Sequence, residues 1–159
     1  MSVLAAVAFL MASCGMAGSR GNGVDNYFSA FTTFENQEWS YGRKIEFRVD
    51  TLRDSVATGG SLMLSLRHTA GYEYSNLWIE LTYPSADSIS TDTFNITLAD
   101  DFGHWRGRGS GPSIQKSDIL KRDFTLIKGS VVGLRHIMRP DTISGIEQIG
   151  IIYLPVKDK

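Results

Sequence analysis

Cysteine is nearly absent from this sequence of 159 residues, since Cys14 is the only one. A single thiol excludes a disulfide within the chain and any site built from paired cysteines. Excess charge of one sign is also missing, because 16 basic and 17 acidic residues leave a net charge of -1 and the basic residues are scattered. This balance argues against a dedicated nucleic-acid-binding surface.

The composition is that of an ordinary folded protein. Hydrophobic residues make up 42% of the chain and charged residues 21%, which supports a core and does not indicate disorder. A chain of this length buries roughly 68–70% of its unfolded surface, so it needs neither a disulfide nor a metal to be stable. We therefore expect a single folded domain with no cofactor and no metal.

The N-terminus carries a distinct local signal. Residues 3–12 form an apolar run of ten residues, too short for a membrane-spanning helix of roughly twenty but typical of an export signal. Met11, Ala12 and Ser13 precede Cys14, and together they resemble the lipobox of bacterial lipoproteins. That resemblance implies diacylglycerol on the Cys14 thiol and cleavage in front of it. The alternative is a non-exported protein with an incidental free thiol.

Lipid attachment would place the protein at a membrane. Each buried methylene of an acyl chain contributes about 0.8 kcal/mol, and two or more chains anchor a protein stably. We predict a signal peptide over residues 1–13, the lipidated Cys14 with a Gly/Ser-rich tether to residue 23, and one domain over residues 24–159. Gly15 after the cysteine, in place of Asp, favours the outer membrane, and the missing acidic run favours a domain that faces the periplasm.

Apolar residues in the rest of the chain alternate in twos, which is the pattern of half-buried strands. Ile45, Phe47 and Val49, for example, share one side of a strand, and Glu46 and Arg48 lie on the other. The pattern predicts strands over residues 27–34, 45–49, 62–66, 77–83, 94–98, 124–126, 132–138 and 149–156. The last is apolar on both sides, which predicts a central strand covered on both faces.

Turn residues separate these runs and complete the fold prediction. They include Gly59 and Gly60, Ala70 and Gly71, and residues 84–87, 103–112 and 140–145. A short helix, with Ser113 as its N-cap, is conceivable over residues 113–122. We predict an all-β protein, an antiparallel two-sheet β-sandwich of jelly-roll or immunoglobulin-like type.

One group of candidate site residues surrounds the end of the third predicted strand. His68 continues the inward side of that strand, where a histidine usually bonds to a backbone carbonyl. Four aromatic residues could form a ligand or partner surface, or a platform that stacks on sugar rings, or could instead fill the core and its corners: Tyr72, Tyr74, Trp78 and Trp105.

A second group lies between residues 92 and 112. Asp100, Asp101 and His104 are close enough in sequence to suggest a metal site or a hydrolase, but they match no EF-hand pattern. The glycines that follow lack the Lys-Ser/Thr ending of a phosphate loop. A structural account fits better: the two aspartates end a strand, Gly103 supplies a positive φ, and Trp105 anchors the hairpin on the core.

The third group lies in the stretch GLRHIMRPD, from Gly133 to Asp141. Arg135 and Arg139 lie on one side of a predicted strand and His136 on the other. The arginines could bind an anion, but pairing with acids across the sheet is favoured. No standard catalytic motif is present, so we expect a protein that is not an enzyme.

Taken together, these motifs resemble the gliding motility lipoprotein GldH family of the Bacteroidetes. The matching blocks are LRHTAGYEYSNLW (66–78), DTFNITLADDFGHWRGRGSG (92–111) and IMRPDTISGIEQIGI (137–151), with the lipobox-like Cys14. The resemblance implies a membrane-anchored lipoprotein whose partners are other envelope proteins of the gliding and secretion machinery. It implies no catalytic residue. The alternative function is a carbohydrate-binding module of an envelope lipoprotein.

Overall fold

The computed structural model describes residues 26–109 and 111–156. The predicted signal peptide, Cys14 and the tether lie outside the described residues. Within them the chain forms ten strands and no helix: β1 (Phe28–Thr33), β2 (Glu38–Ser40), β3 (Ile45–Arg48), β4 (Val56–Thr69), β5 (Asn76–Ser85), β6 (Ser88–Thr97), β7 (Ser113–Ile127), β8 (Val131–His136), β9 (Thr142–Ser144) and β10 (Ile146–Leu154). No helix in this part of the chain is therefore available to cross a membrane.

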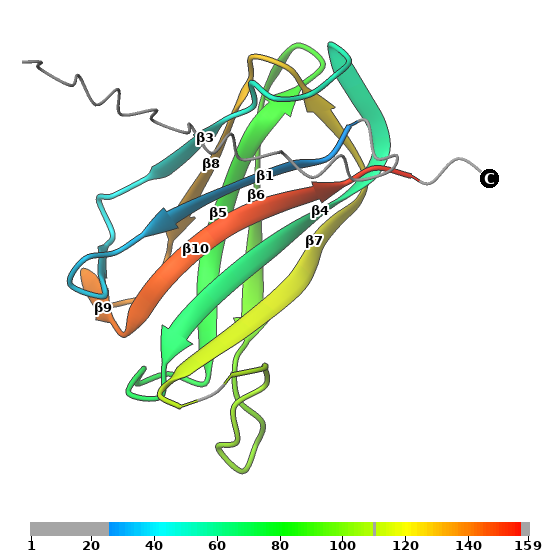
Figure 1. Ribbon diagram of the computed structural model, residues 1–159. Coiled ribbons are helices and arrows are strands. Elements are labelled where there is room, and N and C mark those ends of the chain that lie inside the picture. Colours follow the sequence, from blue (N-terminus) through cyan, green and yellow to red (C-terminus); the bar gives the residue numbers. More distant parts are fainter. Residues whose placement is uncertain (1–25, 110, 157–159) are drawn as a thin grey trace, which may run out of the picture.

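Two four-stranded antiparallel sheets form the body of the protein. One has the order β1-β10-β4-β7 and the other the order β3-β8-β5-β6, while β2 and β9 form a small ribbon at one end. Figure 1 shows the first sheet in front of the second, with the ribbon at one side. The predicted antiparallel β-sandwich is confirmed.

The strand order also decides between the two predicted types of sandwich. If the eight long strands are counted in chain order, the first pairs with the last, the second with the seventh, the third with the sixth and the fourth with the fifth. This is a long hairpin rolled into two sheets, which is the jelly-roll arrangement.

The core lies between the two sheets and follows the predicted alternation. In β5, Leu77, Ile79 and Leu81 are completely buried. Their counterparts in the facing sheet include Leu62, Leu64 and Leu66 of β4 and Ile149, Ile151 and Tyr153 of β10, none more than 1% exposed. Burial of this apolar surface, at about 25 cal/mol per Å², is the main term that holds the sheets together.

The turn predicted at Gly59 and Gly60 is wrong. Both glycines lie inside β4, where the pairing with β7 shifts register on either side of Gly60. Gly59 has a φ of +72°, so the glycines form an irregularity that bends a continuous strand and do not end it.

The conceivable helix over residues 113–122 is also wrong. These residues belong to β7, which pairs with β4 from Ser113 opposite Thr69 to Ile127 opposite Val56. Polar residues outnumber apolar ones in this stretch and several are only half-buried, so the alternation is weak, and pairing with a long neighbour decides the conformation.

The strand predicted over residues 149–156 is central, since β10 lies between β1 and β4. The prediction that both faces are covered is wrong, because Leu154 is 42% exposed and Ile152 is half-buried. The predicted turn over residues 140–145 also contains the short strand β9.

Candidate functional site

A cluster of aromatic side chains closes one end of the sandwich. His68 lies at the end of β4, Tyr72 and Tyr74 follow in the connection to β5, and Trp105 comes from the loop after β6. The His68 ring centroid is 4.7 Å from that of Trp105 and 5.7 Å from that of Tyr72. Tyr72 meets Tyr74 at 5.6 Å with an interplanar angle of 67°. The rings therefore pack edge to face and share no plane.

The members of this cluster differ in exposure. Tyr72 is 3% exposed and its hydroxyl donates to the carbonyl of Asn76 at 3.0 Å. Tyr74 and Trp105 are half-buried against the core. Burial raises the pKa of Tyr72 far above its ordinary value, because the low dielectric disfavours the phenolate. Trp105 anchors its loop on the core, as predicted.

His68 is completely buried. Its Nδ1 lies 2.9 Å from the carbonyl oxygen of Thr69, so the bond to a backbone carbonyl at the strand end is present as predicted. Burial lowers the pKa of His68, although the Thr69 carbonyl acts in the opposite direction. The ring is therefore neutral at pH 7 and donates from Nδ1.

Asp100 and His104 are used within a turn. Asp100 Oδ1 accepts from the N–H groups of Phe102 at 2.9 Å and His104 at 2.8 Å, and Oδ2 lies 3.2 Å from His104 Nδ1. Gly103 has a φ of +82°, as predicted. The His104 and Phe102 backbone donors hold the pKa of Asp100 below its usual value. Nowhere in the described part of the chain do three or more metal-binding side chains cluster.

Trp78 stands apart from the other predicted rings. It lies on the outer face of the sheet that contains β5 and is 41% exposed. Near it, Arg135 of β8 donates to Glu80 of β5 at 2.8 Å, and the two residues are register partners. The Arg135 guanidinium also lies 5.0 Å from the centroid of the Tyr41 ring. The predicted pairing across the sheet is confirmed for Arg135, whereas Arg139 is exposed and has no acidic partner among the described residues.

His136 lies on the inner face of β8 and is completely buried. It contacts Trp39 at 5.3 Å and Tyr41 at 5.9 Å between ring centroids. Burial lowers its pKa, so this ring is also neutral at pH 7. Both buried histidines therefore lie within packed aromatic surroundings at the margins of the core.

The segment Arg-Gly-Arg-Gly over residues 106–109 lies against the start of β7. Arg108 and Gln115 exchange backbone hydrogen bonds at 2.8 and 2.7 Å. A Cβ on Gly107 would stand 2.6 Å from Ile114 Cγ2 and 2.7 Å from the Gln115 carbonyl oxygen. These glycines allow the segment to approach the strand closely. The repeated glycines in the sequence indicate this role only when β7 is known to lie beside the segment.

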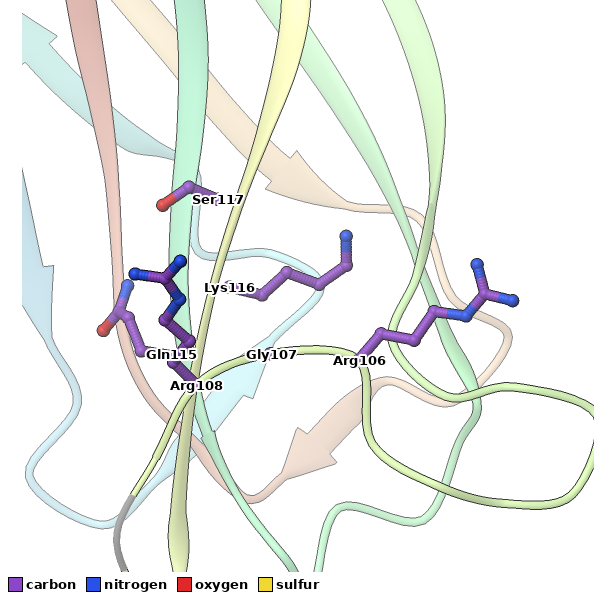
Figure 2. Close-up of a pocket in the computed structure, with 6 residues that line it drawn as sticks. All are labelled: Arg106, Gly107, Arg108, Gln115, Lys116 and Ser117. Carbon is purple, nitrogen blue, oxygen red and sulfur yellow. The ribbon is translucent and has the colours of Figure 1, made fainter.

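This contact borders a basic hollow of about 460 Å³. Figure 2 shows the side chains of Arg106 and Lys116 on one side of β7 and those of Arg108, Gln115 and Ser117 on the other. Lys116 pairs with Asp118, with its Nζ 2.6 Å from Oδ1. Arg106 and Arg108 are exposed and have no acidic partner in the described residues.

A polar clamp joins the two sheets across their open side. Lys121 of β7 pairs with Asp92 of β6, and its Nζ lies 2.6 Å from the hydroxyl of Tyr83, which donates to Asp92 at 2.8 Å. These contacts lower the pKa of Asp92 and raise that of Lys121. Sequence reasoning missed the clamp, because only the order of the strands brings residues 83, 92 and 121 together.

Comparison with known proteins relates the chain to one family. The model of the GldH lipoprotein family matches residues 26–152. No curated protein gives a significant match.

Solved structures resemble the chain only distantly. The Eiger TNF from S. frugiperda is 12% identical, with a TM-score of 0.38 over 84% of this chain and 96% of that one. The PRD1 vertex protein P5 is 10% identical, with a TM-score of 0.41 over 85% of this chain and 99% of that one. Likenesses at these TM-scores carry no functional information.

Proposed function

The chain belongs to the GldH lipoprotein family, and on that premise we propose that it serves the gliding-motility machinery and the protein-secretion system tied to it. Cys14 carries the lipid, residues 15–23 act as a tether, and the β-sandwich faces the periplasm. The outer membrane is favoured over the inner one by Gly15 behind the cysteine. The observation that carries the proposal is the family match, which extends over most of the described domain.

We further propose that the domain acts by binding and not by catalysis. The polar side chains with the strongest interactions have structural roles: Asp100 organises a turn, the Asp92–Lys121 pair clamps two strands, and Glu80 pairs with Arg135. His68 and His136 are neutral and buried among aromatic rings. A binding function instead requires surface that other proteins can contact, and the sandwich offers sheet edges and the exposed Trp78 ring.

The test is crosslinking in the native cell envelope followed by purification of the tagged, full-length protein. The proposal expects other components of the gliding or secretion machinery to be recovered with the wild-type protein and lost with Cys14→Ser, which removes the anchor. Recovery of the same proteins with both variants would contradict a role for the anchor. Recovery of polysaccharide without such proteins would overturn the proposal.

A second candidate function is glycan binding through Trp78. The observation that favours it is the 41% exposure of this ring beside the Glu80–Arg135 pair, because sugars combine stacking on aromatic faces with hydrogen bonds to polar groups. Affinity electrophoresis in polysaccharide from the host envelope tests it. Trp78→Ala should abolish retardation, whereas Phe102→Ala, at a loop residue that is 86% exposed, should not. Equal mobility of the wild type with and without polysaccharide would exclude the idea.

A further inference from the structure

Two neighbouring edge strands form one open side of the sandwich. Strand β6 ends one sheet and β7 ends the other, and the Asp92–Lys121 pair joins them. Edge strands present unpaired backbone groups that can accept another strand, and proteins usually protect them with basic residues, proline, bulges or a covering segment. The two edges differ in how far they are protected.

Strand β7 is well protected. It contains Lys116, Lys121 and Arg122, and its pairing with β4 shifts register at several points. Its first residues are also covered, because Arg108 pairs with Gln115 along the free edge. Strand β7 therefore offers little regular edge with which a further strand could pair.

Strand β6 has few of these protections, since its one charged residue is Asp92, which is already paired with Lys121. Its sequence over Ser88–Thr97 is SISTDTFNIT, with no lysine, arginine or proline. It pairs with β5 in unbroken register, from Ser88 opposite Ser85 to Thr97 opposite Asn76. In the described part of the chain no other strand pairs with it. β6 is thus a regular edge of ten residues that is free to pair.

The hydrogen bonds at the end of β6 show which amides are free. The N–H of Leu98 donates to the Ser75 carbonyl of the β5 side at 2.7 Å. On the other side of β5, the N–H of Ile137 donates to the Trp78 carbonyl at 2.9 Å. Backbone groups alternate in direction along an antiparallel strand. Both bonds therefore imply the same set of amides directed away from β5, which belong to Ile89, Thr91, Thr93, Asn95 and Thr97.

The surface beside this edge has an excess of basic side chains, since five basic residues but only two acidic ones, Asp92 and Asp123, line its hollows. Hollows of about 460, 530 and 400 Å³ follow β7 from Gln115 to Ile127, and the second is also lined by Thr91, Asp92, Thr93 and Phe94 of β6. Lys116 and Lys121 are already paired with Asp118 and Asp92. Arg106 and Arg122 line the hollows, are exposed, and have no acidic partner among the residues described.

From these observations we propose that β6 accepts an extended acidic segment of a partner protein as an added strand. Alternate side chains of such a strand would face β7, where carboxylates could pair with Arg106 and Arg122. A second copy of this chain fits less well, because pairing of β6 with its own copy would bring the two sets of arginines toward each other. The inference rests on the proposed function, since it names the surface through which an envelope partner binds.

Photo-crosslinking in the native host tests where the partner binds. A crosslinking residue replaces Thr93 on the β6 edge or, as a control, Arg48 on the β3 edge at the opposite side of the same sheet. The proposal expects Thr93 to crosslink to one partner segment that carries several carboxylates, and Arg48 not to. Crosslinks between two copies of the chain would overturn it. Crosslinks to an envelope partner from position 48 alone would overturn the proposed β6 site but not the proposed function. The absence of crosslinks from both positions would count against the site and the proposed function.

Matched variants then distinguish backbone pairing at the β6 edge from charge pairing with the arginines. Thr93→Pro removes an amide directed away from β5, whereas Thr93→Val keeps it. Binding of a synthetic peptide of the crosslinked segment should be lost in the first variant and kept in the second. The double variant Arg106→Glu/Arg122→Glu should weaken binding about tenfold, and Arg48→Glu/Lys128→Glu, with the same change of net charge, less than about twofold. Equal affinities within either pair would contradict the proposal.

Amide exchange gives a readout that does not depend on how well the variants fold. Addition of the peptide to the wild-type protein should slow exchange at Thr91, Thr93 and Asn95. Asp92 and Phe94, which already face β5, should change little. Binding without this alternating protection would mean that the peptide docks elsewhere and would overturn strand addition.

Discussion

The N–H of Gly60 in β4 donates to the hydroxyl of Tyr153 in β10 at 3.1 Å. A Cβ on Gly60 would stand 2.6 Å from Tyr153 Cε2. Tyr153 is completely buried and also reaches the Phe124 carbonyl at 3.4 Å. The irregular stretch of β4 therefore makes room for the largest side chain of the central strand.

Gly60→Ala should destabilise the fold by about 1–3 kcal/mol, because the added methyl group overpacks a closed site. Urea unfolding followed by circular dichroism measures the change. Gly42→Ala is the matched control, since nothing lies within 4 Å of the added Cβ, and it should unfold at nearly the wild-type urea concentration. Equal midpoints for the two variants would contradict the packing described for Tyr153.

Stability should fall as the pH drops below about 6.5. His68 and His136 have lowered pKa values in the folded protein because they are buried. The unfolded chain therefore binds protons that the folded chain does not. This difference in bound protons grows as the pH falls below the histidine pKa of the unfolded chain, about 6.5. Above that pH both states are neutral and the penalty disappears.

Urea unfolding at about pH 7.5 and about pH 5.5 measures this dependence. His136→Phe should reduce the loss of stability between the two pH values, because one buried titratable ring is gone. His104→Ala changes a histidine with an 80% exposed side chain and should retain most of the loss. A loss of the same size in wild type and His136→Phe would show that His136 does not titrate in this range.

Gly107→Ala should detach residues 106–108 from β7 without unfolding the sandwich. The added Cβ would meet Ile114 and the Gln115 carbonyl, and the Gln115 N–H, which donates to Arg108 at 2.7 Å, would become free to exchange. Hydrogen exchange should speed up at Gln115 and stay unchanged at core amides such as that of Ile79. Unchanged protection at Gln115 would contradict the covering role of the segment.

Lys121→Met should cost less than about 1 kcal/mol, because the clamp with Asp92 lies at the surface and is screened by solvent. Thermal unfolding with and without added salt measures it, and the difference from wild type should shrink at about 1 M salt. A large, salt-independent loss would contradict this and would show that the Lys121 ammonium contributes mainly through its short contacts with Tyr83, whose hydroxyl lies 2.6 Å and whose ring centroid lies 4.5 Å from Nζ.

The sequence predicted those parts of the fold that depend on local alternation. Leu62, Leu64 and Leu66 repeat every second residue, and so do Leu77, Ile79 and Leu81, because each strand buries one side only. The turn predicted at Gly59 and Gly60 is wrong because two adjacent glycines look the same in a turn and in an irregular strand. What distinguishes them is Tyr153, which is distant in the sequence.

The candidate surface could be predicted only in part. The sequence predicts that Arg135 pairs with an acid, but only the register of β5 and β8 shows that this acid is Glu80. The free amides of β6 and the arginines beside them depend on which strands end the two sheets, and this order is a property of the whole jelly roll. No local pattern in Ser88–Thr97 distinguishes an edge strand from an interior one.

The proposed function in the cell envelope depends most directly on the lipid at Cys14. Growth of the native host with an alkynyl fatty acid, followed by mass spectrometry of the N-terminal peptide of the purified full-length protein, measures it. We predict that the wild-type protein begins at Cys14 and carries the label there, that Ser19→Ala does the same, and that Cys14→Ser carries none. A native protein with residues 1–13 still attached and an unmodified Cys14 thiol would contradict the account.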